Sequence, residues 1–191
     1  MKRIETALPG VCILEPVVHG DHRGFFLEMY HERAFAAVDI RHRFVQDNYS
    51  RSSRHVLRGL HYQLGRPQAK LVRVVRGEVF DVAVDVRRGS PTFGKWIGET
   101  LSEDNRKAMF IPEGFAHGFL VLSEVAEFIY KCSDFYEPRE ERGVIWDDPG
   151  IGIRWPLSES RPLLSTKDAS YGQLVSQPVQ DLPALSPGPC G

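Results

Sequence analysis

Short runs of alternating apolar and polar residues dominate this chain. The segment 71–86, LVRVVRGEVFDVAVDV, predicts two strands that meet at a turn around Gly77. In the second strand the apolar residues Phe80, Val82, Val84 and Val86 share one face, because side chains alternate across a strand, whereas the other face carries Asp81 and Asp85. Several short strands at this spacing predict an all-β sandwich or barrel. Similar runs, separated by Gly, Pro and Ser turn signals, occur at 95–101, 108–111, 118–122 and 125–132.

Helical signals are sparse. Residues 31–38, HERAFAAV, predict one short helix, and residues 102–107 predict a helical turn with Ser102 as its N-cap. Strands and helices do not alternate along the chain, which contains neither Gly-x-Gly-x-x-Gly nor Gly-x-x-x-x-Gly-Lys-[Ser/Thr]. We therefore expect neither a Rossmann domain nor a P-loop.

The composition changes near residue 173. Residues 1–172 predict a single domain, whereas residues 173–191 are rich in Pro, Ser and Gly and contain few large apolar side chains. Such a composition is typical of a loosely ordered tail. The alternative is that Leu182 and Leu185 dock on a neighbour.

Composition and charge exclude several classes of protein. The chain has 191 residues, of which 42% are hydrophobic and 26% charged, and its formal net charge is −1. Without a basic excess, we do not expect it to bind nucleic acid. No apolar run reaches the roughly 18 residues that span a bilayer, and the N-terminus lacks the apolar core of a signal peptide. Cys12, Cys132 and Cys190 form no Cys-x-x-Cys pair, so we expect a reducing, cytoplasmic location without disulfides.

One of four unusually polar segments places a histidine between two cations. His61 follows Arg58 by three residues and precedes Lys70. The simplest interpretation is a half-exposed strand histidine. The alternative is a site for an anion or a developing oxyanion, because buried cations need a partner. The four segments are 21–28, 45–50, 57–63 and 111–119.

Three further residues also have both a structural and a chemical interpretation. His117, between two phenylalanines, is either a pocket-wall histidine or part of a site. Tyr130 lies on the apolar face of a predicted strand, where a tyrosine usually packs in the core but can donate a proton into a polar cavity. Asp168 lies in a segment that by itself reads as a solvated turn.

A metal site in a small β-barrel usually takes two histidines as His-x-His, and because the chain has no such pair we expect no metal.

Taken together, these segments make the sequence resemble the dTDP-4-dehydrorhamnose 3,5-epimerases. The similarity runs from about Leu8 to Tyr171. Each motif is weak by itself, but they occur in the order of the family. They are Asp-x-Arg-Gly-Phe-Phe at 21–26, Gln-Asp-Asn-x-Ser at 46–50, Arg-Gly-Leu-His-Tyr-Gln at 58–63, Ser-Pro-Thr-Phe-Gly at 90–94, Pro-x-Gly-Phe-Ala-His-Gly-Phe at 112–119, Tyr-Lys-Cys-Ser-x-Phe-Tyr at 130–136, Trp-Asp-Asp-Pro at 146–149, Ile-x-Ile-x-Trp-Pro at 151–156 and Ser-x-Lys-Asp at 165–168.

The resemblance implies a fold, a reaction and an assembly. The fold is a cupin-type jelly-roll β-barrel with a few short helices, mainly near the two ends of the chain. The reaction inverts carbons 3 and 5 of dTDP-4-keto-6-deoxy-D-glucose through an enolate, and it needs no cofactor and no metal. The alternative is a related enzyme that inverts only carbon 3 or carbon 5. Family members are typically homodimers that exchange N-terminal strands.

The resemblance also implies the roles of individual residues. His61 corresponds to the general base, Asp168 to the carboxylate that orients it, and Tyr130 to the general acid on the opposite face of the sugar. Lys70 corresponds to a lysine near the carbon-4 carbonyl, and Tyr136 to an aromatic ring that stacks on the thymine. The other matching positions, which line the nucleotide-sugar site, are Arg23, Glu28, Gln46, Asp47, Asn48, Arg58, His117, Glu141 and Lys167.

Overall fold

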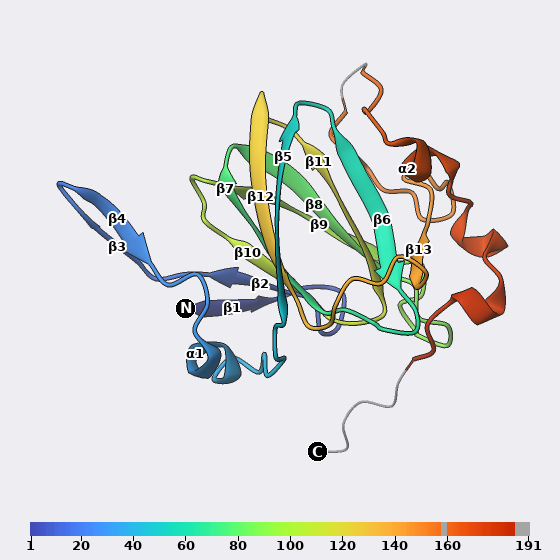
Figure 1. Ribbon diagram of the computed structural model, residues 1–191, viewed down its shortest axis with the longest axis horizontal. Coiled ribbons are helices and arrows are strands. Elements are labelled where there is room, and N and C mark those ends of the chain that lie inside the picture. Colours follow the sequence, from blue (N-terminus) through green and yellow to red (C-terminus); the bar gives the residue numbers. More distant parts are fainter. Residues whose placement is uncertain (158–159, 186–191) are drawn as a thin grey trace.

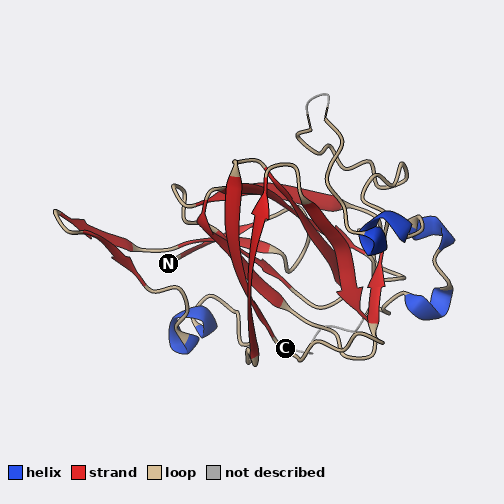
Figure 2. Ribbon diagram, turned by 45° about the horizontal axis from the view of Figure 1, so that its top comes forward, coloured by secondary structure: helices blue, strands red, loops and turns tan. Residues whose placement is uncertain are grey.

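The computed structural model describes residues 1–157 and 160–185, and strands are its main regular secondary structure (Figures 1 and 2). The helices are short: the α-helices are α1 (Glu32–Ala36) and α2 (Thr166–Ser170), and the 3-10 helices are η1 (Leu174–Ser176) and η2 (Val179–Asp181). None of the helices described is long and apolar enough to cross a membrane. The strands are β1 (Lys2–Glu5), β2 (Cys12–Glu15), β3 (Val18–Asp21), β4 (Gly24–Leu27), β5 (Gln46–Ser53), β6 (Leu57–Gln63), β7 (Lys70–Arg76), β8 (Glu78–Asp85), β9 (Trp96–Ser102), β10 (Ala108–Ile111), β11 (Phe115–Val121), β12 (Val125–Cys132) and β13 (Glu141–Gly143).

Two antiparallel sheets face each other and confirm the predicted all-β jelly roll. One sheet has six strands in the order β1-β2-β10-β7-β12-β5, and the other has five in the order β13-β6-β11-β8-β9. Neighbours in these sheets are distant in sequence, as in β7 beside β12 and β6 beside β11, which is the crossover pattern of a jelly roll. The β3–β4 hairpin pairs only with itself and projects from the body of the molecule (Figure 1).

Strand β8 shows why two layers of apolar packing form. Its odd-numbered residues include Val79 and Ala83, which pack between the two sheets. Its even-numbered residues include Val82 and Val84, which belong to a second cluster on the outer side of the five-stranded sheet. Both faces of this strand are therefore buried, as the predicted alternation required.

The second cluster is completed by the C-terminal segment. Leu174 and Leu182 are only 5% and 8% exposed and pack in this cluster. Polar contacts hold the same segment: the backbone N–H of Leu174 donates to Asp148 Oδ2 at 2.6 Å, and Arg142 Nε donates to Asp181 Oδ1 at 2.7 Å.

The structure therefore differs from the expected loose tail over residues 173–185, whereas residues 186–191 lie outside the described part. Leu182 docks on this chain's own sheet and not on a neighbour, while Leu185 is 40% exposed. The physical reason is that two widely spaced leucines suffice where an apolar sheet face lies open to receive them.

The predicted short helix and the predicted turn are both present. The helix expected at 31–38 is α1, whose N-cap His31 accepts from the backbone N–H of Ala34 at 3.3 Å. Residues 102–107 form the single turn that was predicted, in which the N–H of Arg106 donates to the carbonyl oxygen of Ser102 at 2.9 Å. There Ser102 Oγ accepts from the N–H of Asn105, and Asn105 Oδ1 accepts from the N–H of Ser102, each at 3.1 Å. The reciprocal bonds close the turn before a helix can extend.

Replacing Leu182 by Ala tests whether the C-terminal segment is part of the fold. We expect Leu182→Ala to lower the free energy of unfolding by about 2–3 kcal/mol, because it removes a buried side chain and leaves a cavity. Leu185→Ala is the matched control, and we expect it to cost less than about 0.5 kcal/mol because that side chain is largely exposed. Urea unfolding curves measure both. Equal midpoints for the two variants would contradict the packing described.

Candidate active site

Two cavities between the sheets share four polar side chains. Both are lined by Asn48 of β5, His61 of β6, Lys70 of β7 and Tyr130 of β12. The smaller cavity, of about 230 Å³, extends toward Gln46, Gln63, Gln68, Tyr136 and Glu141. The larger, of about 490 Å³, extends toward Arg58, His117, Lys167 and Asp168. The structure thus brings most of the predicted site residues together at one place.

His61 and Asp168 form a hydrogen-bonded pair at the wall of the larger cavity. Asp168 Oδ1 lies 2.5 Å from His61 Nε2, and the carboxylate side chain is only 5% exposed. Burial by itself raises the pKa of Asp168, but the hydrogen bond and charge of His61, together with a bond from Ser165, outweigh burial and hold that pKa below its usual range. Asp168 is therefore a carboxylate that accepts a hydrogen bond from the N–H at Nε2 of His61.

The other ring nitrogen of His61 is left for a ligand. Within the part of the chain that the structure describes, Nδ1 of His61 makes no hydrogen bond, and it is not one of the buried unpartnered atoms. Because Asp168 holds the proton on Nε2, a neutral His61 presents a lone pair at Nδ1. The pair therefore has the arrangement of a general base and the carboxylate that orients it.

The helix α2 positions Asp168 through its cap. Ser165 is the N-cap, and its Oγ accepts from the backbone N–H of Asp168 at 3.0 Å. A serine followed three residues later by an acidic residue is typical of a helix start. This local bond turns a segment that looked like a solvated turn into a rigid support for one catalytic candidate.

Tyr130 faces the cavities from the sheet opposite His61. It lies on β12 of the six-stranded sheet, paired with Asn48 of β5, whereas His61 lies on β6 of the five-stranded sheet. Burial raises the pKa of Tyr130 to about 12, so its hydroxyl stays protonated at neutral pH. Among residues 1–157 and 160–185, no group accepts a hydrogen bond from this hydroxyl. A proton donor and a proton acceptor thus face one space from opposite walls.

Lys70 and Arg58 make the space attractive to an anion. Burial lowers the pKa of Lys70, while the charges of Cys132, Glu141 and Asp81 act in the other direction. No carboxylate in the described ranges lies within ion-pair distance of Lys70, and Arg58 donates only to Ser52 Oγ, at 3.1 Å from both Nε and Nη2. Cations without a paired carboxylate leave room for a negatively charged ligand.

His117 lies beside His61 and has a buried partner that the sequence analysis missed. His117 and His61 are opposite each other on β11 and β6. The carboxylate of Asp81, fully buried, contacts His117 Nε2 at 2.9 and 3.0 Å. Burial lowers the pKa of His117, so its imidazole lines the cavity in the neutral form. The sequence did contain a signal for Asp81, because an acidic residue between Val79 and Ala83 on a buried strand face needs a partner.

Glu141 gathers three donors at the other end of the site. Its carboxylate accepts from the hydroxyl of Tyr136 at 2.7 Å, the hydroxyl of Tyr171 at 2.8 Å and Lys167 Nζ at 2.5 Å. Burial opposes the charge, but these donors and the charge of His61 outweigh it and lower the pKa of Glu141 to about 2. Tyr171 was also missed, since nothing in its local sequence marks it as part of a site.

Gln46 and Asn48 complete the wall of the smaller cavity. Gln46 Nε2 donates to Asn48 Oδ1 at 2.9 Å, and Gln46 Oε1 accepts from the backbone N–H of Tyr136 at 2.9 Å. Both point inward because they are alternate residues of β5. This bond ties the strand to the segment that carries the exposed ring of Tyr136.

Three of the predicted residues lie outside the two cavities. Asp47 points to the opposite face of β5 and accepts from Lys131 Nζ at 2.8 Å. Arg23 lies on the β3–β4 hairpin, where it pairs with Asp21, and Glu28 follows the hairpin. Within one chain, these residues do not approach the His61–Asp168 pair.

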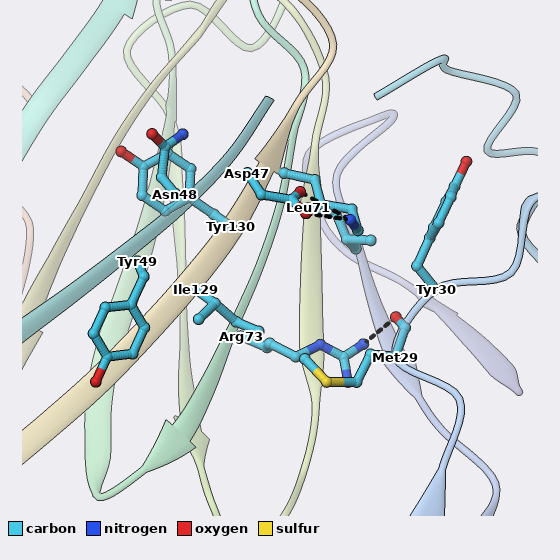
Figure 3. A pocket seen from close by; sticks show the side chains of 10 residues that line it. Met29, Tyr30, Asp47, Asn48, Tyr49, Leu71, Arg73, Ile129 and Tyr130 are labelled. Carbon is cyan, nitrogen blue, oxygen red and sulfur yellow. Dashed lines mark hydrogen bonds and ion pairs between the residues drawn. The ribbon is translucent and has the colours of Figure 1, made fainter. Parts of the chain in front are cut away.

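Asp47 lines a third cavity, on the outer face of the six-stranded sheet (Figure 3). This cavity, of about 520 Å³, is bounded by Met29, Tyr30 and Arg73, and Arg73 Nη2 donates to the carbonyl oxygen of Met29 at 2.9 Å. It lacks the His61–Asp168 pair and Lys70. Asn48 and Tyr130 line this cavity too, but the predicted catalytic residues come together only in the two cavities between the sheets.

The side chains do not assemble a metal-binding group in the regions that the structure describes. No three His, Cys, Asp or Glu residues there are close enough to hold a metal ion.

Comparisons with known proteins identify relatives over nearly the whole chain. Residues 5–176 match the family model described as dTDP-4-dehydrorhamnose 3,5-epimerase. A protein of that name from Pseudomonas aeruginosa is 60% identical over 169 residues, covering 88% of this chain and 93% of the relative.

Solved structures are similar as well. One is the dTDP-6-deoxy-D-glucose-3,5-epimerase RmlC of Legionella pneumophila in complex with dTDP-4-keto-L-rhamnose, with TM-score 0.94 and 49% identity, covering 97% of this chain and 99% of that one. Another is ChmJ, a 3'-monoepimerase of Streptomyces bikiniensis in complex with dTDP-quinovose, with TM-score 0.87 and 37% identity, covering 94% and 91%.

Acid titration tests the charge cluster at Glu141. The pKa of Glu141 in the folded protein, about 2, is below its ordinary value of 4.5, so its stabilisation is complete above about pH 4.5 and is lost as the pH falls toward 2. We expect Glu141→Gln to lower the free energy of unfolding by roughly 1–3 kcal/mol at pH 7, and this deficit to shrink between pH 5 and pH 3.

Denaturant unfolding at several pH values measures the effect. The matched control is Glu124→Gln, because that carboxylate is 84% exposed, and we expect no comparable loss. A deficit of Glu141→Gln that stays constant from pH 7 to pH 3 would contradict the assigned charge.

Proposed function

The chain belongs to the family of dTDP-4-dehydrorhamnose 3,5-epimerases, and we propose that His61 and Tyr130 carry out its proton transfers on a dTDP-4-keto-6-deoxy sugar held between the two sheets. The reaction of this family converts dTDP-4-keto-6-deoxy-D-glucose to dTDP-4-keto-L-rhamnose by inverting carbons 3 and 5. The observation that carries the proposal is the placement of His61 and Tyr130 on facing sheets around shared cavities.

The first step is removal of a proton next to the carbonyl. Protons on carbons 3 and 5 are both α to the carbon-4 carbonyl, so the electron pair of a broken C–H bond moves into an enolate. Imidazole titrates near neutral pH and suits this task. Nδ1 of His61 takes the proton, and the adjacent carboxylate of Asp168, 2.5 Å from Nε2, stabilises the imidazolium that forms.

Lys70 stabilises the enolate. Its ammonium group lines both cavities and has no carboxylate partner in the regions described, so it can meet the carbon-4 oxygen as negative charge develops there. Fixed cations in a site that excludes water act more strongly than they would in solution. Arg58, in the larger cavity, fits the diphosphate because a guanidinium pairs well with phosphate oxygens.

Inversion requires that the new proton arrive on the opposite face. Tyr130 reaches the space from the sheet that faces His61, and its phenol is protonated at neutral pH. It donates its proton to the enolate carbon and the carbonyl reforms, after which solvent exchange returns both residues to their starting forms. The hydrogen leaves and returns as a proton, so the balance of the step requires no oxidant or reductant.

The smaller cavity suits the nucleotide. The ring of Tyr136 is 48% exposed and its hydroxyl is held by Glu141, so one face of the ring is free to stack on a thymine. Gln46 and Asn48 offer amide groups beside it. Lys167 and Glu141 link this end of the site to the helix that carries Asp168.

The protein acts as a homodimer in which each chain completes the other's site. Arg23 lies on the projecting β3–β4 hairpin, whose Phe25 and Phe26 are 59% and 66% exposed. Large exposed aromatic side chains on a protruding hairpin favour an interface. Arg23 and Glu28 cannot serve their own cavity from this position, so we assign them to the cavity of a second copy that exchanges N-terminal strands.

Replacing Tyr130 by Phe separates the two proton transfers. The hydroxyl has no hydrogen-bond partner in the described ranges, so we expect stability to change by less than about 1 kcal/mol. In deuterium oxide, Tyr130→Phe should exchange substrate protons with retention of configuration, because His61 still forms the enolate and returns deuterium to the original face. Inverted product should nearly disappear. Proton NMR of recovered substrate and product measures both.

Two further variants control this experiment. His61→Ala should abolish exchange and inversion together, because no base remains, whereas Asp168→Asn should slow both without changing their ratio. With the unaltered enzyme, the same NMR spectra show whether both carbons are inverted or only one. Inversion of both centres by Tyr130→Phe at an undiminished rate would disprove the role of Tyr130.

Co-expression of two defective chains tests the exchanged hairpin. Arg23→Ala and His61→Ala should each reduce activity strongly. If Arg23 acts on the partner's cavity, a mixed dimer contains one intact site, and a statistical mixture regains roughly a quarter of the native activity. If Arg23 acts within its own chain, co-expression restores nothing. A sedimentation mass of 21.7 kDa, that of the single chain, would also contradict the assembly.

A further inference from the structure

A glycine stands opposite the catalytic histidine in the sheet. Gly143 of β13 pairs with His61 of β6 in an antiparallel register. A Cβ atom at Gly143 would overlap the ring of Tyr171. The backbone of Gly143 is not in the left-handed region, so conformation does not require glycine here. Glycine is required here by the lack of space, because a side chain at this position would displace the ring of Tyr171.

The ring of Tyr171 uses this space to contact His61. The two rings meet edge to face, with centroids 5.7 Å apart and an interplanar angle of 68°. The far end of the ring is anchored, because its hydroxyl donates to Glu141 Oε1 at 2.8 Å. The backbone at the next residue is held as well, because the N–H of Ile145 donates to the carbonyl oxygen of Gly172 at 3.0 Å.

One hydrogen bond alone does not fix an imidazole. Asp168 holds Nε2 of His61, but a ring with a single partner can still pivot about that bond and about its own side-chain torsions. A second ring that packs against the side of the imidazole removes that freedom. Asp168 and Tyr171 lie three residues apart, in α2 and immediately after it, so one short segment supplies both the bond and the packing.

We propose that Tyr171 is a positioning residue for His61, admitted to its place by the missing side chain of Gly143. Its ring keeps the imidazole in the orientation that points Nδ1 at the substrate carbon. This inference rests on the proposed function of His61 as the base. It assigns to Gly143 and Tyr171 a part in the rate of proton abstraction and not in the binding of the nucleotide.

The test measures deuterium exchange into saturating dTDP-4-keto-6-deoxyglucose, together with the Kd for dTDP. We expect Tyr171→Ala and Gly143→Ala each to slow exchange roughly tenfold to hundredfold, because small misplacements of a reacting group cost that much. The Kd for dTDP should change less than threefold, because the side chains proposed to contact the nucleotide stay in place. Tyr171→Phe keeps the ring but loses its bond to Glu141, so it should slow exchange clearly less than Tyr171→Ala does.

A double variant separates this mechanism from a general disturbance. If Gly143→Ala acts by displacing the ring, adding it to Tyr171→Ala should slow exchange no further. The matched control is Gly172→Ala, whose Cβ would make only an ordinary contact with Gln177 at 3.6 Å and which should exchange normally. Circular dichroism and melting curves confirm that each variant is folded.

The outcomes are distinct. Native exchange in Tyr171→Ala, with exchange abolished in His61→Ala, would overturn the positioning role and leave the base assignment intact. Equal losses in Tyr171→Phe and Tyr171→Ala would also overturn it, because the hydroxyl and not the ring would then matter. Exchange that persists in His61→Ala would instead disprove the proposed function.

Discussion

The hydrogen bond between His61 and Asp168 joins parts of the chain that are 107 residues apart, and the rest of the site is arranged around it. A carboxylate that is 5% exposed is stable as an anion only if it is paired, so Asp168 depends on the histidine as much as the histidine depends on it. The cap at Ser165 fixes the direction of the carboxylate. The proposed proton chemistry thus rests on an interaction that also pairs a buried charge.

The two facing sheets allow side chains to approach a bound sugar from opposite directions, which a single sheet could not do. A base and an acid that act on opposite faces of a sugar must approach from opposite directions. His61 and Tyr130, the proposed base and acid, are placed to do so because β6 and β12 belong to facing sheets, with the cavities between them. The walls also bury Lys70 and His117, and this burial depresses both pKa values. The buried Asp81 limits the cost by pairing with one of these groups.

The C-terminal part of the chain combines packing with chemistry. Leu174 and Leu182 cover the outer face of the five-stranded sheet, whereas α2, a few residues earlier, delivers Asp168 to the inner side. Tyr171 lies between α2 and the buried Leu174, so loss of packing in this segment would also loosen the support of the proposed base. The segment is held by these buried leucines and by the bond from the N–H of Leu174 to Asp148.

The sequence by itself determined the sheet-forming segments and the chemistry-bearing motifs. Alternation predicted β7 to β12, and the motif around His61 marked the proposed base, because both are local patterns. Tertiary structure decided what depends on distant residues. Asp81 and Tyr171 joined the site only through pairing with His117 and Glu141, Asp47 turned away because β5 alternates, and Leu182 found its partner on this chain's own sheet. Side-chain periodicity is a local property, whereas partnership in a buried site depends on which strands the fold brings together.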